Sequence, residues 1–120
     1  MIEGAHIDKN SHKNNGKTMI QALVGFDNTV KAALDFAKSD GHTLVVITAD
    51  HETGGITLAE NGTYVFTQGY HTDVDVPLFV YGSDKFIANG ETVNNYEIAR
   101  RIAYAAGATE KEFPCAVKVS

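Results

Sequence analysis

Apolar residues at helical spacing predict one long helix in the first third of the chain. They recur every three or four residues after Thr18, which places them on one face. The helix is expected to start at a cap on Thr18 paired with Gln21, or in a shorter version at Asp27. Gly41 stands where a left-handed cap residue is wanted and should end it. The core-facing residues are Leu23, Phe26, Val30, Leu34 and Ala37.

Short apolar runs after this helix predict strands. Leu44 to Thr48 is a continuous β-branched and apolar run, typical of a strand buried on both faces of a helix-covered sheet. Val76 to Tyr81 is a second such run. Between them, residues 57–59 and 64–66 flank a tight-turn signal and predict a hairpin in place of a crossover helix. Ala116 to Val119 could add a short strand.

These elements together predict an α/β fold. Asn94, with Glu97 three residues later, should start a second helix that ends at Gly107. We expect one domain with a small mixed sheet, whose two buried strands end at a ligand site. The helices around residues 21–38 and 95–106 should cover this sheet, and the hairpin should protrude from it.

Composition and charge narrow the classes of function. The chain has 120 residues, 43% of them hydrophobic, which suits one domain with a core. A net charge of -5 without a basic stripe argues against a nucleic-acid partner. Cys115 is the only cysteine, which excludes an internal disulfide and a multi-cysteine zinc site. No apolar run approaches the roughly 18 residues of a membrane span.

Two acidic-histidine pairs stand in predicted loops. Asp8 and His12 are four residues apart in the polar stretch from Gly4 to Lys17, which we interpret as a loop with a turn of helix. One such turn would point both side chains the same way. Asp50 and His51 follow a buried strand at its carboxyl end, where α/β sheets bind ligands. The plain alternatives are solvated surface residues and a loop-capping aspartate.

Two further residues could also bind a metal ion. His71 on its own would be interpreted as a surface or hydrogen-bonded histidine. Imidazole and carboxylate without cysteine suit zinc, and three protein ligands leave a fourth position for substrate. Glu3, which offers only oxygen, would suit magnesium better.

Four strings along the chain resemble motifs of the alkaline phosphatase family in their usual order. The resemblance extends over nearly the whole chain up to Ala106. It implies a phosphomonoester hydrolase that works through a phosphoserine with two zinc ions and one magnesium ion. The strings are Ile2-Glu3-Gly4, Ile7-Asp8-Lys9-Asn10-Ser11-His12, Thr48-Ala49-Asp50-His51-Glu52-Thr53-Gly54-Gly55, and Gly69-Tyr70-His71-Thr72 with Val76-Pro77.

The resemblance also implies roles for single residues. Lys9 is similar to a lysine that some members of the family use near the phosphate. Six residues match metal ligands of the family: Asp8, His12 and His71 for the first zinc, Asp50 and His51 for the second, and Glu3 for magnesium.

The family's nucleophile has no match in this chain. That nucleophile is a serine in an Asp-Ser-Ala context, and none of the serines at positions 11, 39, 83 and 120 stands in one. The resemblance therefore implies that residues 1–120 are the C-terminal portion of an alkaline phosphatase domain, truncated upstream of residue 1. Such a fragment would be inactive alone, and its exposed sheet edge could pair with a second copy as a homodimer. The compartment stays open, although the family is commonly periplasmic or exported.

Three alternatives are kept beside this interpretation. A metal-dependent phosphomutase or sulfatase of the same superfamily shares the Asp-x-x-x-His, Asp-His and His pattern, although Glu3 and the string around Asp50 favour the phosphatase. A receiver-like signalling domain could accept a phosphoryl group at Asp50, but the predicted hairpin and the adjacent His51 argue against it. The isolated chain could also be a metal-binding module without catalysis.

Overall fold

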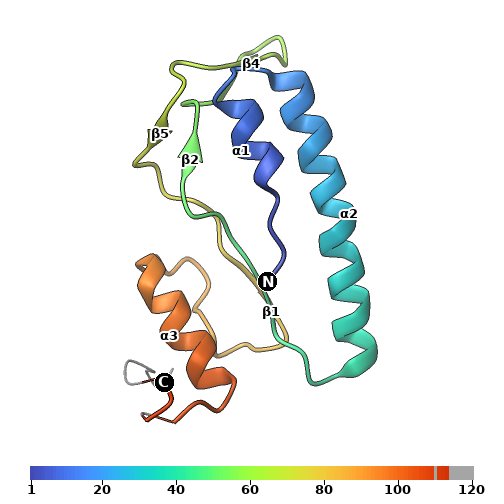
Figure 1. Cartoon of the computed structure of the whole chain (residues 1–120), viewed down its shortest axis with the longest axis vertical. Coiled ribbons are helices and arrows are strands. Elements are labelled where there is room, and N and C mark those ends of the chain that lie inside the picture. The colour runs from blue at the N-terminus through green and yellow to red at the C-terminus, as the bar shows by residue number, and fades with distance from the viewer. Residues whose placement is uncertain (110, 114–120) are drawn as a thin grey trace.

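The computed structural model describes residues 1–109 and 111–113 (Figure 1). In the described residues, two helices precede a run of short strands and a third helix follows them, a mixture of helices and small sheets that confirms the predicted α/β class. The molecule measures 48 × 31 × 25 Å. In chain order the elements are α1 (Ala5–Ser11), α2 (Gly16–Asp40), β1 (Val45–Ile47), β2 (Glu52–Thr53), β3 (Thr57–Leu58), β4 (Tyr64–Val65), β5 (His71–Thr72), β6 (Phe79–Tyr81) and α3 (Asn95–Ala105).

The long helix α2 begins earlier than predicted and ends as predicted. The Asn15 side chain accepts a hydrogen bond of 3.2 Å from the Thr18 amide, so Asn15 is the cap and Thr18 lies inside the helix. Caps at Thr18 or Asp27 were therefore wrong, because asparagine satisfies the free amides of the first turn equally well. At the other end Gly41 adopts φ +72° and its amide donates to the Ala37 carbonyl.

The expected core face of α2 is only partly covered. Met19 and Ala37 are 5% and 1% exposed, whereas Leu23, about one turn after Met19, is 43% exposed. Helix α1 and strand β1 pack against α2, and Figure 1 places them near its two ends. The periodicity thus predicted the helix correctly but overstated how much of its apolar face is buried.

The described strands form three antiparallel pairs rather than one mixed sheet. β1 pairs with β6, with Val45 opposite Tyr81 and Ile47 opposite Phe79. Burial of these strands on both faces was wrong, since β1 is half-buried and Phe79 and Tyr81 are exposed. Only β1 ends toward the candidate site, because β6 runs in the opposite direction. A hairpin and an extended return, without a crossover helix, join the two and permit this antiparallel pairing.

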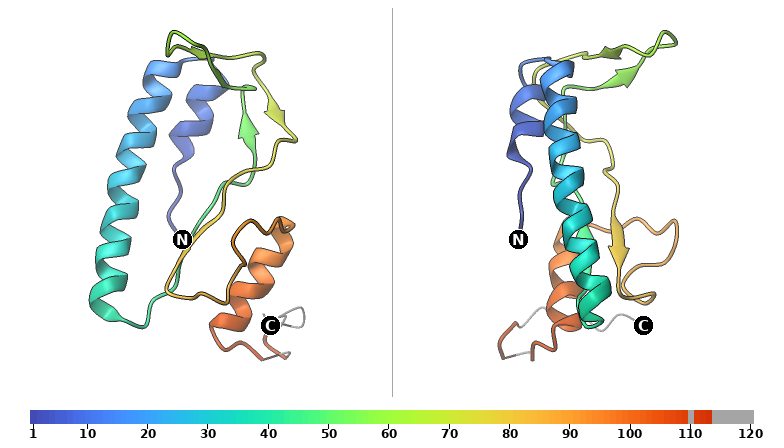
Figure 2. Two further views of the ribbon diagram at one scale, coloured as in Figure 1. Left: turned by 180° about the vertical axis from the view of Figure 1, so that it is seen from behind. Right: turned by 90° about the vertical axis from the view of Figure 1, so that its right-hand side faces the viewer.

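The predicted hairpin is confirmed by the pairing of β3 with β4. Thr57 stands opposite Val65, and the connecting turn contains Gly62 at φ +80°. Figure 2 shows the hairpin projecting from the end of the molecule where α1 lies. A hairpin at this position also disagrees with a receiver-like fold, which needs a crossover helix here. The possible strand at Ala116 to Val119 lies outside the described residues.

Helix α3 lies at the opposite end of the molecule and has the predicted bounds to within one or two residues (Figure 1). The Asn94 side chain donates to the Tyr96 hydroxyl instead of capping the helix. Arg101 attaches α3 to the preceding loop by donating to the Phe86 carbonyl and to the Glu91 carboxylate. The hydrogen bonds from Arg101 are the main reason that the pKa of Glu91 falls to about 2. Within the described residues, no helix combines the length and apolarity needed to cross a membrane.

Replacing Gly82 by alanine should destabilise the β1–β6 pair. Gly82 has φ +101°, and a Cβ there would lie 2.7 Å from the Thr43 carbonyl oxygen. We expect Gly82→Ala to lower the free energy of unfolding in urea by about 1–3 kcal/mol, the usual scale of such backbone strain. Gly25→Ala is the matched control, because this helical position is open and alanine should stabilise it by about 0.5–1 kcal/mol. Equal effects of the two substitutions would contradict this account.

Candidate metal centre

Helix α1 places Asp8 and His12 on one face. The helix begins after Gly4, and the His12 amide caps its end by donating to the Asp8 carbonyl at 2.9 Å. The four-residue spacing then brings Asp8 Oδ1 within 3.3 Å of His12 Nε2. The predicted turn of helix is confirmed, as part of a seven-residue helix.

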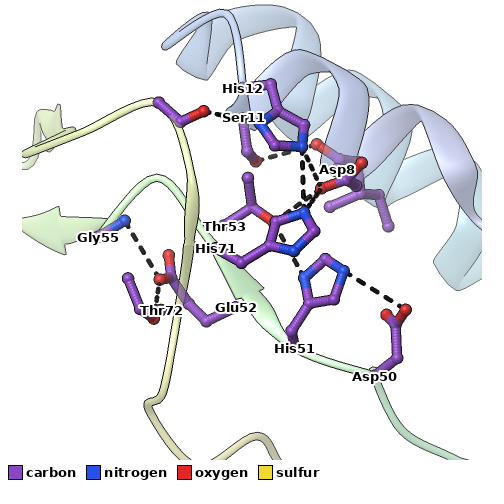
Figure 3. Close-up of polar contacts among 12 residues, drawn as sticks. Asp8, Ser11, His12, Asp50, His51, Glu52, Thr53, Gly55, His71 and Thr72 are labelled. Atoms are coloured by element: carbon purple, nitrogen blue, oxygen red, sulfur yellow. Dashed lines mark hydrogen bonds and ion pairs between the residues drawn. The ribbon is translucent and has the colours of Figure 1, made fainter.

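Strand pairing brings His71 to the same point. β2 and β5 pair antiparallel, with Thr53 opposite His71. His71 Nε2 lies 3.1 Å from His12 Nε2 and 3.7 Å from Asp8 Oδ1 (Figure 3). One ligand atom from each of Asp8, His12 and His71 lies within 4.8 Å of the others. Half of the His71 side chain is exposed, so the cluster is open to solutes.

The geometry and the donor set of this cluster fit zinc. Tetrahedral zinc with bonds of about 2.0–2.1 Å spaces its ligand atoms about 3.3 Å apart, close to the distances found here. His12 Nδ1 lies 2.7 Å from the Gly69 carbonyl oxygen, which can only accept, so His12 Nδ1 must carry a proton. In a neutral His12 the Nε2 lone pair then faces the Asp8 carboxylate, an arrangement that a cation between them would make favourable.

The second predicted pair lies directly beside this cluster. His51 Nε2 is 3.4 Å from Asp50 Oδ2, again the spacing of two ligands of one ion. The His51 ring stacks on the His71 ring, with centroids 3.5 Å apart and planes inclined by 19°. The Asp50 side chain is 85% exposed. The fold thus places the two histidine-aspartate groups side by side, although they come from different segments.

Thr53 is a site residue that sequence reasoning missed. Its hydroxyl is 2.7 Å from Asp8 Oδ1 and 3.1 Å from His51 Nδ1, and the residue is only 7% exposed. A signal was present in the sequence, because residues two apart in an extended chain point to the same side. The Thr53 side chain could therefore have been expected to lie on the same side of the strand as His51.

Glu52 links strand β2 to strand β5 and to the turn that follows β2. Its carboxylate accepts hydrogen bonds from the Thr72 hydroxyl and from the Gly55 and Ile56 amides. Partial burial alone would raise the pKa of the Glu52 carboxyl, but these hydrogen bonds outweigh it and hold the pKa below its ordinary value. An ionised Glu52 thus stabilises the β2–β5 pair and, with it, the position of His71.

Glu3 and Lys9 are not drawn into the cluster. Glu3 is exposed and helps to line a cavity of about 530 Å³ between the N-terminal segment and α2. Lys9 is an exposed side chain on α1, next to Asp8 in the sequence. The roles expected for these two residues stay predictions.

Comparison with known protein sequences finds similarity to alkaline phosphatases. A family model described as alkaline phosphatase matches residues 1–70. Alkaline phosphatase 4 of Bacillus subtilis is 47% identical over 62 residues, which are 52% of this chain and 13% of that protein. The alkaline phosphatase of Escherichia coli is 36% identical over 107 residues, which are 88% of this chain and 23% of that protein.

Comparison with solved structures also finds similarity to alkaline phosphatases. The alkaline phosphatase from the Antarctic bacterium TAB5 is 38% identical, with a TM-score of 0.81 that covers 89% of this chain and 34% of that one. A mutant of TAB5 alkaline phosphatase with Mg bound in the M3 site is 37% identical, with a TM-score of 0.81 over 89% of this chain and 35% of that one. The chain therefore spans well under half the length of these relatives.

The contribution of Glu52 to stability should depend on pH. Because its pKa is depressed in the folded chain, its ionised form stabilises the fold above the ordinary value of 4.5. This contribution is lost as the pH falls through the lower pKa of the folded state. Glu52→Gln should therefore lower the Tm by several degrees near neutral pH and by progressively less in acid.

Thermal melts across this pH range provide the measurement. Glu60→Gln, at an exposed position in the β3–β4 turn, serves as the control and should leave the Tm nearly unchanged throughout. A Tm difference for Glu52→Gln that stays constant from neutral to acidic pH would show that the Glu52 carboxylate does not act in this way.

Proposed function

Because the chain belongs to the alkaline phosphatase family, we propose that it forms the metal-binding part of a phosphomonoester hydrolase. Asp8, His12 and His71 are the ligands of a first zinc ion in this proposal. The observation that carries it is the convergence of Asp8 Oδ1, His12 Nε2 and His71 Nε2, which are 3.1 to 3.7 Å apart. The hydrogen bond from His12 to the Gly69 carbonyl supports it, since it directs Nε2 into the cluster.

Asp50 and His51 contribute to a second zinc site in this proposal, and Glu3 contributes to a magnesium site. The 3.4 Å spacing of the Asp50 and His51 atoms and their position beside His71 support the zinc assignment. The magnesium assignment relies on the chemistry of an oxygen ligand and on the family motif around Glu3. Lys9 is proposed, from the motif alone, to lie near the phosphate.

The reaction proposed for the whole enzyme is hydrolysis of a phosphomonoester through a phosphoserine. Two zinc ions, when bound, would supply positive charge to the attacking and leaving oxygens of an in-line displacement. The residues of this chain hold and orient these ions and leave the cluster open to substrate, because His71 is half exposed. Ser11, beside His12, is buried and donates its hydroxyl proton to the Ile7 carbonyl, so it is not offered as the nucleophile.

The relatives support a phosphatase over a phosphomutase or a sulfatase. The Bacillus subtilis relative and the Escherichia coli relative are both named as alkaline phosphatases. Glu3 and the string from Thr48 to Gly55 were the sequence features that favoured the same choice.

The 120-residue chain should bind zinc without hydrolysing a simple aryl phosphate. His12→Ala removes one of three converging ligands, so zinc affinity at the first site should fall by more than the roughly 10- to 100-fold that loss of a supporting partner costs. Chelator competition gives the affinities, and release of the aryl alcohol from the zinc-loaded chain gives the activity.

His6→Ala is the matched control for this experiment. His6 lies on the same helix α1 and is exposed, but it is not among the three residues of the cluster, so its loss should leave zinc affinity unchanged. Failure of the refolded chain to take up zinc would contradict the proposed site. Turnover by the pure zinc-loaded chain that disappears in His12→Ala would contradict the expected lack of activity.

A further inference from the structure

One buried hydroxyl touches both candidate metal sites. Thr53 Oγ1 lies 2.7 Å from Asp8 Oδ1 and 3.1 Å from His51 Nδ1 (Figure 3). Asp8 belongs to the first proposed zinc site and His51 to the second. We propose that Thr53 is a positioning residue whose hydroxyl fixes the Asp8 carboxylate and the tautomer of His51 together, an inference that rests on the proposed function.

The number of available protons sets the direction of both hydrogen bonds. An ionised carboxylate can only accept, whereas a threonine hydroxyl has one proton and two lone-pair positions. The Thr53 proton therefore goes to Asp8 Oδ1, which is also the nearer of the two partners. A Thr53 lone pair then faces His51 Nδ1, and a hydrogen bond forms there when His51 Nδ1 carries the proton. Thr53 thus selects the tautomer in which His51 Nε2 is unprotonated and carries a lone pair.

That tautomer prepares His51 to bind a cation. His51 Nε2 lies 3.4 Å from Asp50 Oδ2, so its lone pair and the carboxylate oxygen converge on the same point. The first site is arranged in the same way. The Gly69 carbonyl accepts a hydrogen bond from His12 Nδ1, so the unprotonated His12 Nε2 faces Asp8. Hydrogen bonds from the far ring nitrogen commonly fix metal-binding histidines in this way. Thr53 does so for His51 while orienting a ligand of the other site.

Burial and strand pairing fix the orientation of the Thr53 side chain. It is 7% exposed, and its β-branched side chain has few rotamers. It stands opposite His71 in the β2–β5 pair, and the amide of the next residue, Gly54, donates to the Tyr70 carbonyl at 2.9 Å. The backbone on both strands therefore sets where the hydroxyl points.

Two substitutions separate the hydroxyl from the side-chain shape. Thr53→Val keeps the branched shape and removes the hydroxyl, whereas Thr53→Ser keeps the hydroxyl. Long-range proton–nitrogen correlation NMR of the metal-free 120-residue chain at alkaline pH, where imidazoles are neutral, gives the His51 tautomer. Chelator competition with zinc gives the affinity of each site.

We expect the Nδ1–H tautomer of His51 in the unsubstituted chain and in Thr53→Ser, and its partial loss in Thr53→Val. Zinc affinity at the second site should fall by about 10- to 100-fold in Thr53→Val and recover in Thr53→Ser. Thr57→Val is the control, because it removes an exposed hydroxyl on strand β3, outside the cluster, and should leave the His51 tautomer unchanged.

Finding the Nε2–H tautomer in the unsubstituted metal-free chain would overturn the proposal, and this test needs no variant to fold. An unchanged tautomer and unchanged zinc affinity in folded Thr53→Val would overturn it as well. An unsubstituted chain that takes up no zinc, but whose Nδ1–H tautomer is lost in Thr53→Val, would support the role of Thr53 and contradict the proposed function.

Discussion

The pairing of β2 with β5 determines where the side chains of the proposed metal ligands meet. Thr53 stands opposite His71 in this two-stranded ladder, so a single pairing brings the third ligand of the first site beside the residue that contacts Asp8. Glu52 accepts hydrogen bonds from Thr72 and from the turn that follows β2, which holds the two strands in this register. A shift of β5 by one residue against β2 would turn His71 to the opposite face of the pair, away from Thr53.

Around this ladder, the fold brings imidazole lone pairs and carboxylate oxygens, all of them electron-rich acceptors, close together. In the neutral tautomers inferred above, His12 Nε2 faces Asp8 Oδ1, and His51 Nε2 faces Asp50 Oδ2. Lone pairs that converge in this way repel one another, and a bound cation turns the repulsion into attraction. Any ion that binds the folded chain more tightly than the unfolded one also stabilises the fold. Metal binding at the proposed sites would therefore be coupled to the stability of the fold, through the same hydrogen bonds that orient the proposed ligands.

Features set by neighbouring residues were predictable from the sequence, and features set by distant ones were not. The period of α2, its Gly41 cap and the β3–β4 turn are local, and the structure has all three. The burial of β1 was overestimated, because an apolar run does not reveal what packs against it. Asp8 and His12 followed from helical spacing. His71, 59 residues beyond His12, was found only by family resemblance, since strand pairing creates its contact.

The first proposed site combines a helix and a strand pair, and this combination would give metal exchange there a stepwise route. Asp8 and His12 are held by α1, which packs on its sequence neighbour α2. His71 depends instead on a ladder of two residues per strand. So short a pairing can open locally at a lower free-energy cost than unfolding of the helices. Such an opening would withdraw His71 and leave an ion on two protein ligands, from which it can depart or be replaced while α1 and α2 stay folded.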